Sequence, residues 1–493
     1  MTHTSLSNAD SSQQTHFKNV RTLMDSTATW PRSAGVDAVY FFMDPGWETE
    51  PPGNRWHYGR RFARTVPVYL LQGTLTASQR TSVSEPEPRI LGATILRVRR
   101  IKRASLPEAE ASSALAAAQI LQHMQDHHIK RPLFWIITPW WGQVVQMLPA
   151  RFRVFHVCDD YWRMAGLVDD QASGEVPPLF GQLLPRTGGA AQVMLAVSHG
   201  VAVAALAGVP GVPCRVVTNG CDFSVFSGGT PDADILHAAA GRRIAVYGGK
   251  LGSNVNWSLL NRLAEANPGT FLALFGREEA LLTSEAEEER LHLLARDNVC
   301  HLGEVPQVRL REIYAAAHLG IIPYLELPHI VESSFAMKTL EYAAAGLPVI
   351  TSHLKSVRGL ATAIRVCVGD DEFAHVYAQL DRRTLTEAEL AELERVARTY
   401  DYDTLFAQAC RELETVLSAG PTRLTAADPE WDAWWQNRPM ASATEFLTEA
   451  HRRRPDPVLA SELNRRNEEA VPPSSTAVTK IRWWAPWTWR IAN

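Results

Sequence analysis

Short apolar runs that alternate with amphipathic stretches constrain the fold of this chain more than any other feature. From Val36 onward, five runs of this kind end at Gly, Pro, Asp or Ser and cover 36–43, 66–72, 132–138, 153–158 and 193–198. Such runs are typical of parallel strands that helices cover on both faces. Between them lie helix-like segments, the clearest at 108–128. This alternation predicts a doubly wound α/β domain.

The same alternation restarts after a turn-rich break at 216–234. The second series of apolar runs covers 243–249, 270–276, 299–303, 319–324, 347–352 and 364–370. We therefore expect two Rossmann-like domains that face a central crevice, with a ligand at the carboxyl ends of the strands. The expected organisation is a disordered leader (1–35), an N-terminal acceptor domain (36–222), a hinge linker (223–240), a C-terminal donor domain (241–395), a closing helix (396–420) and a Trp-rich tail (421–493).

Length and charge limit the class of protein. A chain of 493 residues exceeds one ordinary core, and 46% hydrophobic with 21% charged residues is typical of a soluble globular protein. The formal net charge of −4 gives no global argument for a nucleic-acid partner, and we expect none.

Cysteine spacing and the first residues indicate the compartment. The six cysteines form no CxxC pair, which argues against a zinc site and a disulfide framework and favours a reducing cytosol. The first residues lack the basic and apolar regions of a signal peptide, and no apolar stretch reaches the length of a membrane span. We expect a cytoplasmic protein.

A glycine-rich turn opens the second series. The sequence VYGGKLGSN ends a predicted strand in Gly248 and Gly249 and follows them with Lys250. Glycines let the backbone approach a phosphate, while helix amides and the Lys250 ammonium supply positive potential. By itself this turn is common in doubly wound folds, so it is a weak indication of a ligand loop.

A second stretch, SSFAMKTLEYAAAG at 333–346, carries two ionised groups in an otherwise apolar helix. Lys338 and Glu341 lie three residues apart, on one face of a helix, so they either form an ion pair or both contact a charged ligand. The stretch follows one predicted strand and precedes another, which places Ser333 to Phe335 at the helix N-terminus, facing the crevice.

These motifs and their order resemble the retaining GT-B glycosyltransferases of family 4, also called glycosyl transferases group 1. The resemblance covers roughly residues 216–360, including TNGCDFSVF at the hinge and HLGEVP near a nucleoside base. It implies that Ala336 and Met337 lend amides, Lys338 meets the donor diphosphate and Glu341 holds the ribose. The donor-binding residues that it implies are Gly248, Gly249, Lys250, Gly303, Ser333, Ser334, Phe335, Ala336, Met337, Lys338 and Glu341.

One position departs from the pattern of that family. The family often has a glutamate eight residues before the one that matches Glu341, and Ser333 stands there instead. Either the loop shifts so that Glu332 acts, or the chain is similar to a branch with a small residue at this point. The second interpretation matches the surrounding sequence better.

The first series carries residues that the same resemblance assigns to the acceptor. Asp44 and Gly46 follow the first predicted strand, and His57 starts the next helix. Asp159 and Asp160 lie just past a strand end, where they would hold an acceptor hydroxyl. An acidic pair at this place is also a common helix N-cap, and that reading stays open for at least one of the two.

The chemistry of the donor suggests how catalysis would proceed. A nucleoside diphosphate leaving group gains negative charge, so cations and amides must be preorganised around it. We expect Lys250 and Lys338 to serve this role without a metal, and Asp159 and Asp160 to complete the catalytic set. No tightly bound cofactor is expected, the donor substrate is of UDP or GDP type, and retention of configuration is implied by the resemblance alone.

Two surface features have competing readings. His123, His127 and His128 lie together on one predicted helix, and an exposed polar face is favoured over a metal site. The basic run 97–103 is either a solvated strand edge or a patch for an anionic lipid or lipid-diphosphate acceptor.

The C-terminal segment 480–493 combines three cations with four tryptophans and has no acid. Tryptophan with arginine suits a membrane interface, while aromatic tails also dock on their own protein or on a partner. We expect a contact of one of these kinds, including a peripheral one at the inner face of the plasma membrane.

The sequence thus predicts an enzyme that transfers a sugar from a nucleotide sugar to a glycan, lipid-linked or small-molecule acceptor, in exopolysaccharide, cell-envelope glycan or glycosylated-metabolite synthesis. Two alternatives remain: a GT-B sugar-nucleotide epimerase or phosphorylase, and an inactive GT-like binding or scaffolding subunit. Ser333 and Asn256, which stand where related sequences often have acids, keep the last alternative open.

Overall fold

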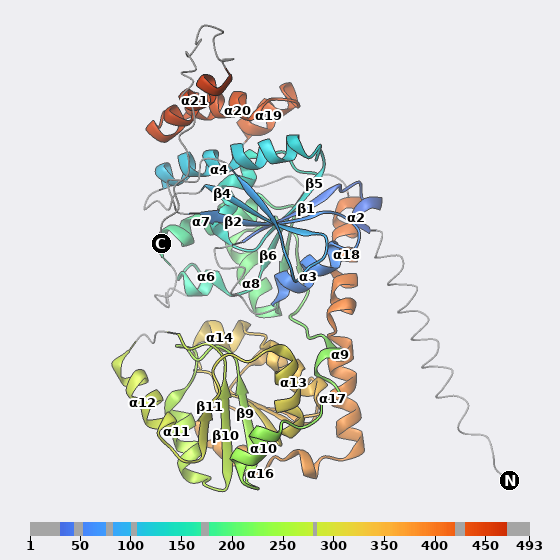
Figure 1. The fold of residues 1–493 in the computed structure, drawn as a ribbon, viewed down its shortest axis with the longest axis vertical. Helices are drawn as coiled ribbons and strands as arrows, with labels where there is room; N and C mark the ends of the chain where they lie inside the picture. The colour runs from blue at the N-terminus through green and yellow to red at the C-terminus, as the bar shows by residue number, and fades with distance from the viewer. Residues whose placement is uncertain are drawn as a thin grey trace, which may run out of the picture.

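The computed structural model describes residues 30–43, 53–74, 82–99, 106–168, 177–279, 283–419 and 429–470. These residues form two α/β domains, one above the other, and a group of helices on the far side of the first domain (Figure 1). Asp44, Gly46, the segment 480–493 and most of the predicted leader lie outside the described residues.

The first domain is built on an eight-stranded sheet in the order β3-β4-β2-β1-β5-β6-β7-β8, in which only the β3–β4 pair is antiparallel among the described strands. The central strands β1, β5 and β6 are buried along their whole length and mostly apolar, with Arg153 and His156 of β6 as buried polar exceptions. The strands are β1 (Ala38–Phe42), β2 (Val68–Thr74), β3 (Val83–Pro86), β4 (Ala93–Arg99), β5 (Pro132–Ile136), β6 (Phe152–Val157), β7 (Val193–Ala196) and β8 (Cys214–Val216).

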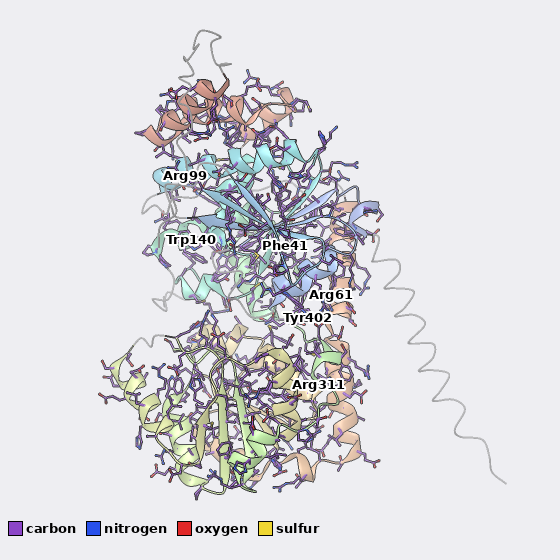
Figure 2. All side chains as sticks on the ribbon, in the orientation of Figure 1. Phe41, Arg61, Arg99, Trp140, Arg311 and Tyr402 are labelled. Atoms are coloured by element: carbon purple, nitrogen blue, oxygen red, sulfur yellow. The ribbon has the colours of Figure 1, made fainter. Side chains whose placement is uncertain are left out.

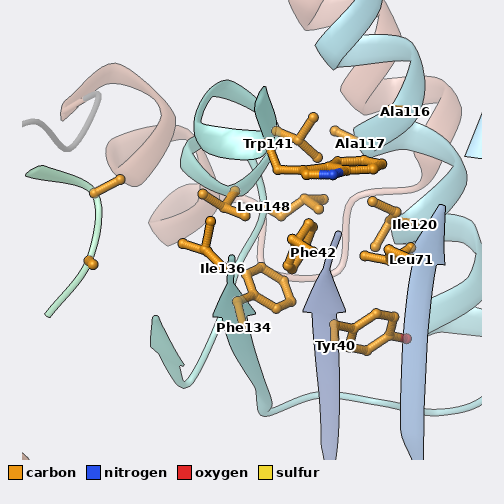
Figure 3. Packing of buried hydrophobic residues seen from close by; sticks show 14 of the residues in the cluster. Tyr40, Phe42, Leu71, Ala116, Ala117, Ile120, Phe134, Ile136, Trp141 and Leu148 are labelled. Atoms are coloured by element: carbon orange, nitrogen blue, oxygen red, sulfur yellow. The ribbon is translucent and has the colours of Figure 1, made fainter. Parts of the chain in front are cut away.

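Aromatic packing holds one face of this sheet against helix α4 (Leu106–Asp126). The rings of Phe42 and Phe134 meet at 5.0 Å, and Trp141 covers Phe42 beneath the α4 alanines (Figure 3). The other helical segments of the domain are α2 (Trp30–Ser33), α3 (Asn54–Phe62), η2 (Pro139–Trp141), α5 (Gly142–Met147), α6 (Tyr161–Met164), α7 (Pro178–Gly189) and α8 (His199–Gly208).

The second domain has a six-stranded sheet in the order β11-β10-β9-β12-β13-β14, with every pairing parallel. Its strands are β9 (Arg243–Gly248), β10 (Thr270–Phe275), β11 (Val299–His301), β12 (Leu319–Ile322), β13 (Val349–Thr351) and β14 (Ile364–Val366). Its helices are α9 (Phe223–Phe226), α10 (Ala233–Ala239), α11 (Trp257–Ala266), α12 (Ser284–Leu294), α13 (Gln307–Ala316), α14 (Pro328–Ser333), α15 (Met337–Ala344), η3 (Lys355–Val357), α16 (Asp370–Gln379), η4 (Arg382–Thr384) and α17 (Glu387–Thr399). The predicted fold class, two doubly wound domains, is confirmed.

The chain passes between the domains twice, at adjacent places. Cys221 and Tyr402 belong to the two crossings, and the Tyr402 amide donates to the Cys221 carbonyl at 3.1 Å. After the second crossing, α18 (Tyr402–Ser418) runs along the first domain and completes its core (Figure 1). In the predicted linker 223–240, Phe226 and Ile235 pack in the core of the second domain, so the first crossing lies between β8 and α9.

The tryptophan-rich C-terminal region forms α19 (Pro429–Asn437), α20 (Ala443–Arg453) and α21 (Pro457–Ala470). Helices α20 and α21 pack on α4, and α19 contributes tryptophans to the same apolar cluster. Phe446 is fully buried and Trp431 nearly so, both in the same cluster as the α4 alanines. The Trp435 indole donates to the Met147 carbonyl at 2.8 Å. These residues therefore extend the core of the first domain, on the side away from the second (Figure 1).

No helix in the described part of the chain combines the length and the apolar character that a membrane span requires.

Candidate functional site

Three glycine turns meet at the carboxyl ends of β9, β10 and β11. Gly249, Gly276 and Gly303 all have positive φ angles, of 148°, 128° and 67°. The Gly276 amide donates to the Gly303 carbonyl at 2.8 Å, and a Cβ added at Gly276 would lie 1.9 Å from the Gly249 carbonyl oxygen. Side chains are thus kept out where the turns pack on one another, and a ligand can approach the backbone closely. The Gly249 amide itself donates to the Phe275 carbonyl at 2.9 Å. A Cβ at Gly303 would meet nothing within 4 Å, so this turn borders open space.

Gly248, the predicted partner of Gly249 in the ligand loop, has a packing role. A Cβ there would lie 2.0 Å from the Phe275 ring. The Gly248 amide donates to the Tyr342 hydroxyl at 2.9 Å, so this donor is already used. Gly248 permits close packing of β9 beneath the turn, while Gly249 lies in the turn itself.

Helix α15 begins beside these turns. Its N-cap residue, Ala336, has no side chain that can accept from the first-turn amides. The Thr339 amide donates to the Ala336 carbonyl at 3.0 Å, which leaves the Met337 and Lys338 amides to an anion. The Lys338 ammonium donates to the Tyr324 hydroxyl at 2.6 Å and lies over the Tyr247 ring. A Cβ at Gly249 would lie 2.7 Å from that ammonium, so the structure brings the loop and the predicted diphosphate lysine together.

Glu341 lies one turn further along α15 and is partly buried. Its carboxylate accepts from the Tyr314 hydroxyl at 3.2 Å. Burial raises the pKa of Glu341, against the opposing attraction of Lys338. In the described part of the chain Lys338 and Glu341 form no direct ion pair, since Lys338 points to Gly249 and Tyr324. Both groups therefore remain available to a ligand.

Lys250 points along the rim of the crevice. Its exposed ammonium pairs with Glu279 at 3.3 Å, and Arg277 contacts the same carboxylate. Contact of Lys250 with a diphosphate stays a prediction, and it would require the side chain to leave Glu279.

The loop that leads into α15 is held by neighbours on three sides. The buried Ser333 hydroxyl donates to Asp160 and accepts from Arg163 at 3.1 Å. The carbonyls of Ser334 and Phe335 accept from other side chains, Ser356 and Asn219 respectively, the latter at 2.6 Å. The loop thus lies beside the donor site, with Ser333 turned toward the first domain. Met337 follows, with its sulfur 3.7 Å from the Tyr402 hydroxyl.

The acidic pair after β6 divides into two roles. Asp160 is buried and caps α6, accepting from the Arg163 amide at 3.1 Å and pairing with its guanidinium. The N-cap reading that the sequence left open therefore holds for Asp160. Asp159 precedes it and is exposed at the strand end.

His57 faces the hinge. It is 2% exposed, stacks on Tyr402 with ring centroids 3.8 Å apart, and has its Nδ1 3.3 Å from Asp222. Burial lowers the pKa of His57, although Asp222 opposes this. The structure places the predicted acceptor residue between the domains, under a tyrosine ring.

Sequence reasoning missed Arg61, which holds both crossings from α3. Its guanidinium contacts Asp222 on the first crossing at 3.0 Å and Asp403 after the second at 2.7 Å (Figure 2 labels Arg61 and Tyr402). The two acids lie 161 and 342 residues away in the chain, so no local pattern indicates the contact.

The remaining candidates have ordinary partners. His123 is buried against the Tyr40 hydroxyl at 2.9 Å, and burial lowers its pKa to about 4. Glu332 pairs with Lys355. Arg97 contacts Glu85, while residues 100–103 of the basic run lie outside the described residues. No three His, Cys, Asp or Glu side chains in the described ranges are grouped to hold a metal ion.

Two facing parallel sheets, joined by paired crossings and a returning C-terminal helix, define the GT-B class. Residues 257–380 match the family model described as Glycosyl transferases group 1, a match that includes Gly276, Gly303, Lys338 and Glu341. The resemblance predicted from the motifs is therefore confirmed for this part of the chain. No curated protein sequence matches the chain at a significant level.

Solved structures similar to the chain share the whole GT-B fold. Sucrose-phosphate synthase from Thermosynechococcus elongatus aligns with a TM-score of 0.60 at 14% identity, covering 78% of this chain and 100% of that one. Anabaena Alr3699/HepE, solved with UDP and glucose, aligns at 0.57 and 14%, covering 77% and 100%. The Escherichia coli trehalose-6-phosphate structure with UDP-2-fluoro glucose aligns at 0.57 and 11%, covering 77% and 99%. At these identities the likeness shows the fold.

Proposed function

We propose that the chain transfers a sugar from a nucleoside diphosphate sugar to an acceptor held across the crevice. The proposal rests on one observation. The Gly249 turn, the uncapped start of α15 and the Lys338 ammonium lie next to one another. A diphosphate placed there would meet amides, a helix N-terminus and a cation together. Neighbours with this fold were solved with UDP and glucose or with UDP-2-fluoro glucose, which supports a donor of UDP type.

Residue roles follow from this placement. As the anomeric carbon–oxygen bond breaks, its electron pair passes to the leaving diphosphate, whose charge Lys338 and the α15 amides stabilise. Glu341 accepts from the ribose hydroxyls while Tyr314 fixes its carboxylate. Asp159 is the group from the first domain that we place at the acceptor, and Asp160 supports it from the start of α6. Turnover without a metal and retention of configuration are further parts of the proposal.

The acceptor belongs to the proposal only as a class. The first domain would bind the acceptor, which is a glycan, a lipid-linked sugar or a small molecule. The corresponding pathways are exopolysaccharide, cell-envelope glycan and glycosylated-metabolite synthesis. A structural neighbour from Burkholderia xenovorans was solved with glucose-6-phosphate, so a sugar phosphate belongs in the test panel. A cytoplasmic location, and a membrane or protein contact through residues 480–493, stay predictions.

The test measures donor binding and transfer separately. Calorimetry with UDP, GDP and dTDP identifies the nucleotide that binds. Release of that diphosphate from its sugar conjugates is then measured with and without acceptors. EDTA is present in these assays, so that turnover without a metal is tested as well. We expect Lys338→Ala to weaken binding of the preferred diphosphate by about 10- to 100-fold, because a charge-assisted contact contributes about 1.5–3 kcal/mol. Lys130→Ala, an exposed lysine of the first domain, is the matched control.

Unchanged diphosphate affinity in Lys338→Ala would contradict the assignment of this lysine to the diphosphate. No heat and no thermal shift with any of the three diphosphates would contradict the enzyme as a whole. A donor sugar that is isomerised without any acceptor, and never transferred, would favour the epimerase alternative.

A further inference from the structure

One direct contact crosses the crevice at Ser333, the last residue of α14. From the first domain, the Ser198 hydroxyl donates to the Ser333 carbonyl at 2.6 Å. The Ser333 hydroxyl meets Asp160 and Arg163, as described above. Ser198, Asp160 and Ser333 are all at most 3% exposed, so the contact is dry and its polar groups satisfy one another. The cluster Ser198, Asp160, Arg163 and Ser333 is called the crevice contact below.

The first domain reaches this contact through two helix starts. Ser198 is the N-cap of α8 and also accepts from the Val201 amide at 3.1 Å, while Asp160 is the N-cap of α6. Each helix follows directly on a strand, β7 for α8 and β6 for α6. Both caps therefore occupy the crevice edge of the first sheet and hold one residue of the second domain.

Gly200 shows how closely the two domains approach. A Cβ at this position would lie 1.9 Å from the Glu332 carbonyl oxygen and 2.9 Å from the Ser333 hydroxyl. Gly200 lies in the first turn of α8 and has no positive φ, so its helix does not require glycine. The requirement for glycine comes from the domain on the other side.

The contact lies three residues before Ala336, the N-cap of α15. Ser333 is held by the first domain and the Phe335 carbonyl by Asn219 on the first crossing. Asn219 is bonded to Asn54 of α3, whose side chain also accepts from the Tyr402 hydroxyl at 2.5 Å. The path into the Ala336 N-cap is thus fixed from the first domain and the hinge, rather than from the second domain alone.

We propose that Gly200 and Ser333 are positioning residues that couple closure of the crevice to the placement of the α15 amides and Lys338. This inference rests on the proposed function and deepens it. The closed contact sets the loop 333–336, so the leaving diphosphate is stabilised fully only when the acceptor domain is in place. Donor binding, which uses the second domain, does not need the contact.

Gly200→Ala is the deciding variant, because alanine favours the helix while its methyl group cannot fit in the closed contact. We expect an unchanged or higher melting temperature, a diphosphate affinity within threefold of wild type, a kcat at least tenfold lower and a larger radius of gyration by small-angle X-ray scattering. Val203→Ala, on the solvent face of the same helix, should match wild type in all four measurements.

Ser333→Ala is the second variant and removes only the hydroxyl. Since the bond from Ser198 to the carbonyl remains, we expect a kcat roughly three- to tenfold lower and an unchanged donor KM. Wild-type kcat and radius of gyration in Gly200→Ala would overturn the proposal. A loss of diphosphate affinity as large as in Lys338→Ala would also overturn it, by making the contact part of the donor site. If wild type binds no nucleotide, the proposed function fails, while the scattering comparison still tests the contact.

Discussion

The two crevice edges of this molecule are built in opposite ways. On the second domain the turns after β9, β10 and β11 are glycines packed backbone to backbone, and the start of α15 is uncapped. On the first domain the helices that follow β6 and β7 start at capping side chains, Asp160 and Ser198, which also bond to Ser333 of the second domain. The start of α15 has no side-chain cap, whereas these two caps hold the domains together.

This difference separates two kinds of polar residue at a strand end: those available to a ligand and those already bonded to another domain. A diphosphate needs little more than amides and a cation, so the donor edge can be made of small residues. Asp160 and His57 were predicted as ligand groups from their positions. In the structure Asp160 belongs to the crevice contact and His57 lies at the hinge, and a ligand role stays a prediction for both. The polar atoms of both side chains contact groups at the boundary between the domains. A position at a strand end does not by itself distinguish this role from ligand binding.

The sharpest way to break the comparison is to add a side chain to the donor edge. Gly249→Ala would place its Cβ 2.7 Å from the Lys338 ammonium, at a φ of 148° that alanine rarely adopts. Strain of roughly 1–3 kcal/mol and a displaced cation should weaken diphosphate binding by about 100-fold or more. Calorimetry measures this. Gly269→Ala, whose Cβ would meet nothing within 4 Å, should bind as wild type, and equal affinities in both variants would refute the open edge.

The acceptor side is tested by removing a hinge cation. Arg61→Met leaves the Asp222 and Asp403 carboxylates without their shared guanidinium, so the free energy of unfolding should fall by about 3 kcal/mol. Urea denaturation measures the change. Arg64→Met removes an exposed partner of Asp403 at 3.4 Å and should cost less than about 1 kcal/mol. Equal costs for the two variants would show that burial does not set the strength of this hinge.

The smallest expected effect is a dependence of the stability of the first domain on pH. Burial lowers the pKa of His57, of His123 to about 4 and of His156 to about 3. Since the unfolded chain takes up these protons near pH 6.5, stability is fully present above that pH and is lost as the pH falls toward the folded pKa values. Melting curves from pH 7.5 to 5 check this, and His156→Gln should flatten the slope. An identical slope in His156→Gln would exclude that histidine.

Much of this architecture could be predicted from the sequence, because buried parallel strands are continuous apolar runs. Gly249, Gly303 and the spacing of Lys338 and Glu341 could also be identified from the sequence, because the proposed donor site is assembled from short local motifs. The direction of Lys250 toward Glu279 was not, since the two residues lie on different turns.

Contacts between distant segments were beyond the sequence pattern. Ser333 was singled out as a departure from a family motif, but its partner Asp160 lies in the other domain, and only the relative placement of the domains joins them. The Trp-rich C-terminal region was expected to be an added tail. What the pattern did not show is where this extension packs: α20 and α21 lie on α4, and Phe446 and Trp431 join its apolar cluster.

The core of the first domain is closed by parts of the chain that follow the second domain in the sequence. Leu405 and Leu413 of α18 fill one side of it, and Phe446 of α20 fills the other. On the ribosome the second domain, whose core ends with α17, can therefore finish folding while the first is still waiting for its final helices. The half of the protein that emerges first is the half that matures last, and its unfinished apolar faces are the surfaces a chaperone would meet during synthesis.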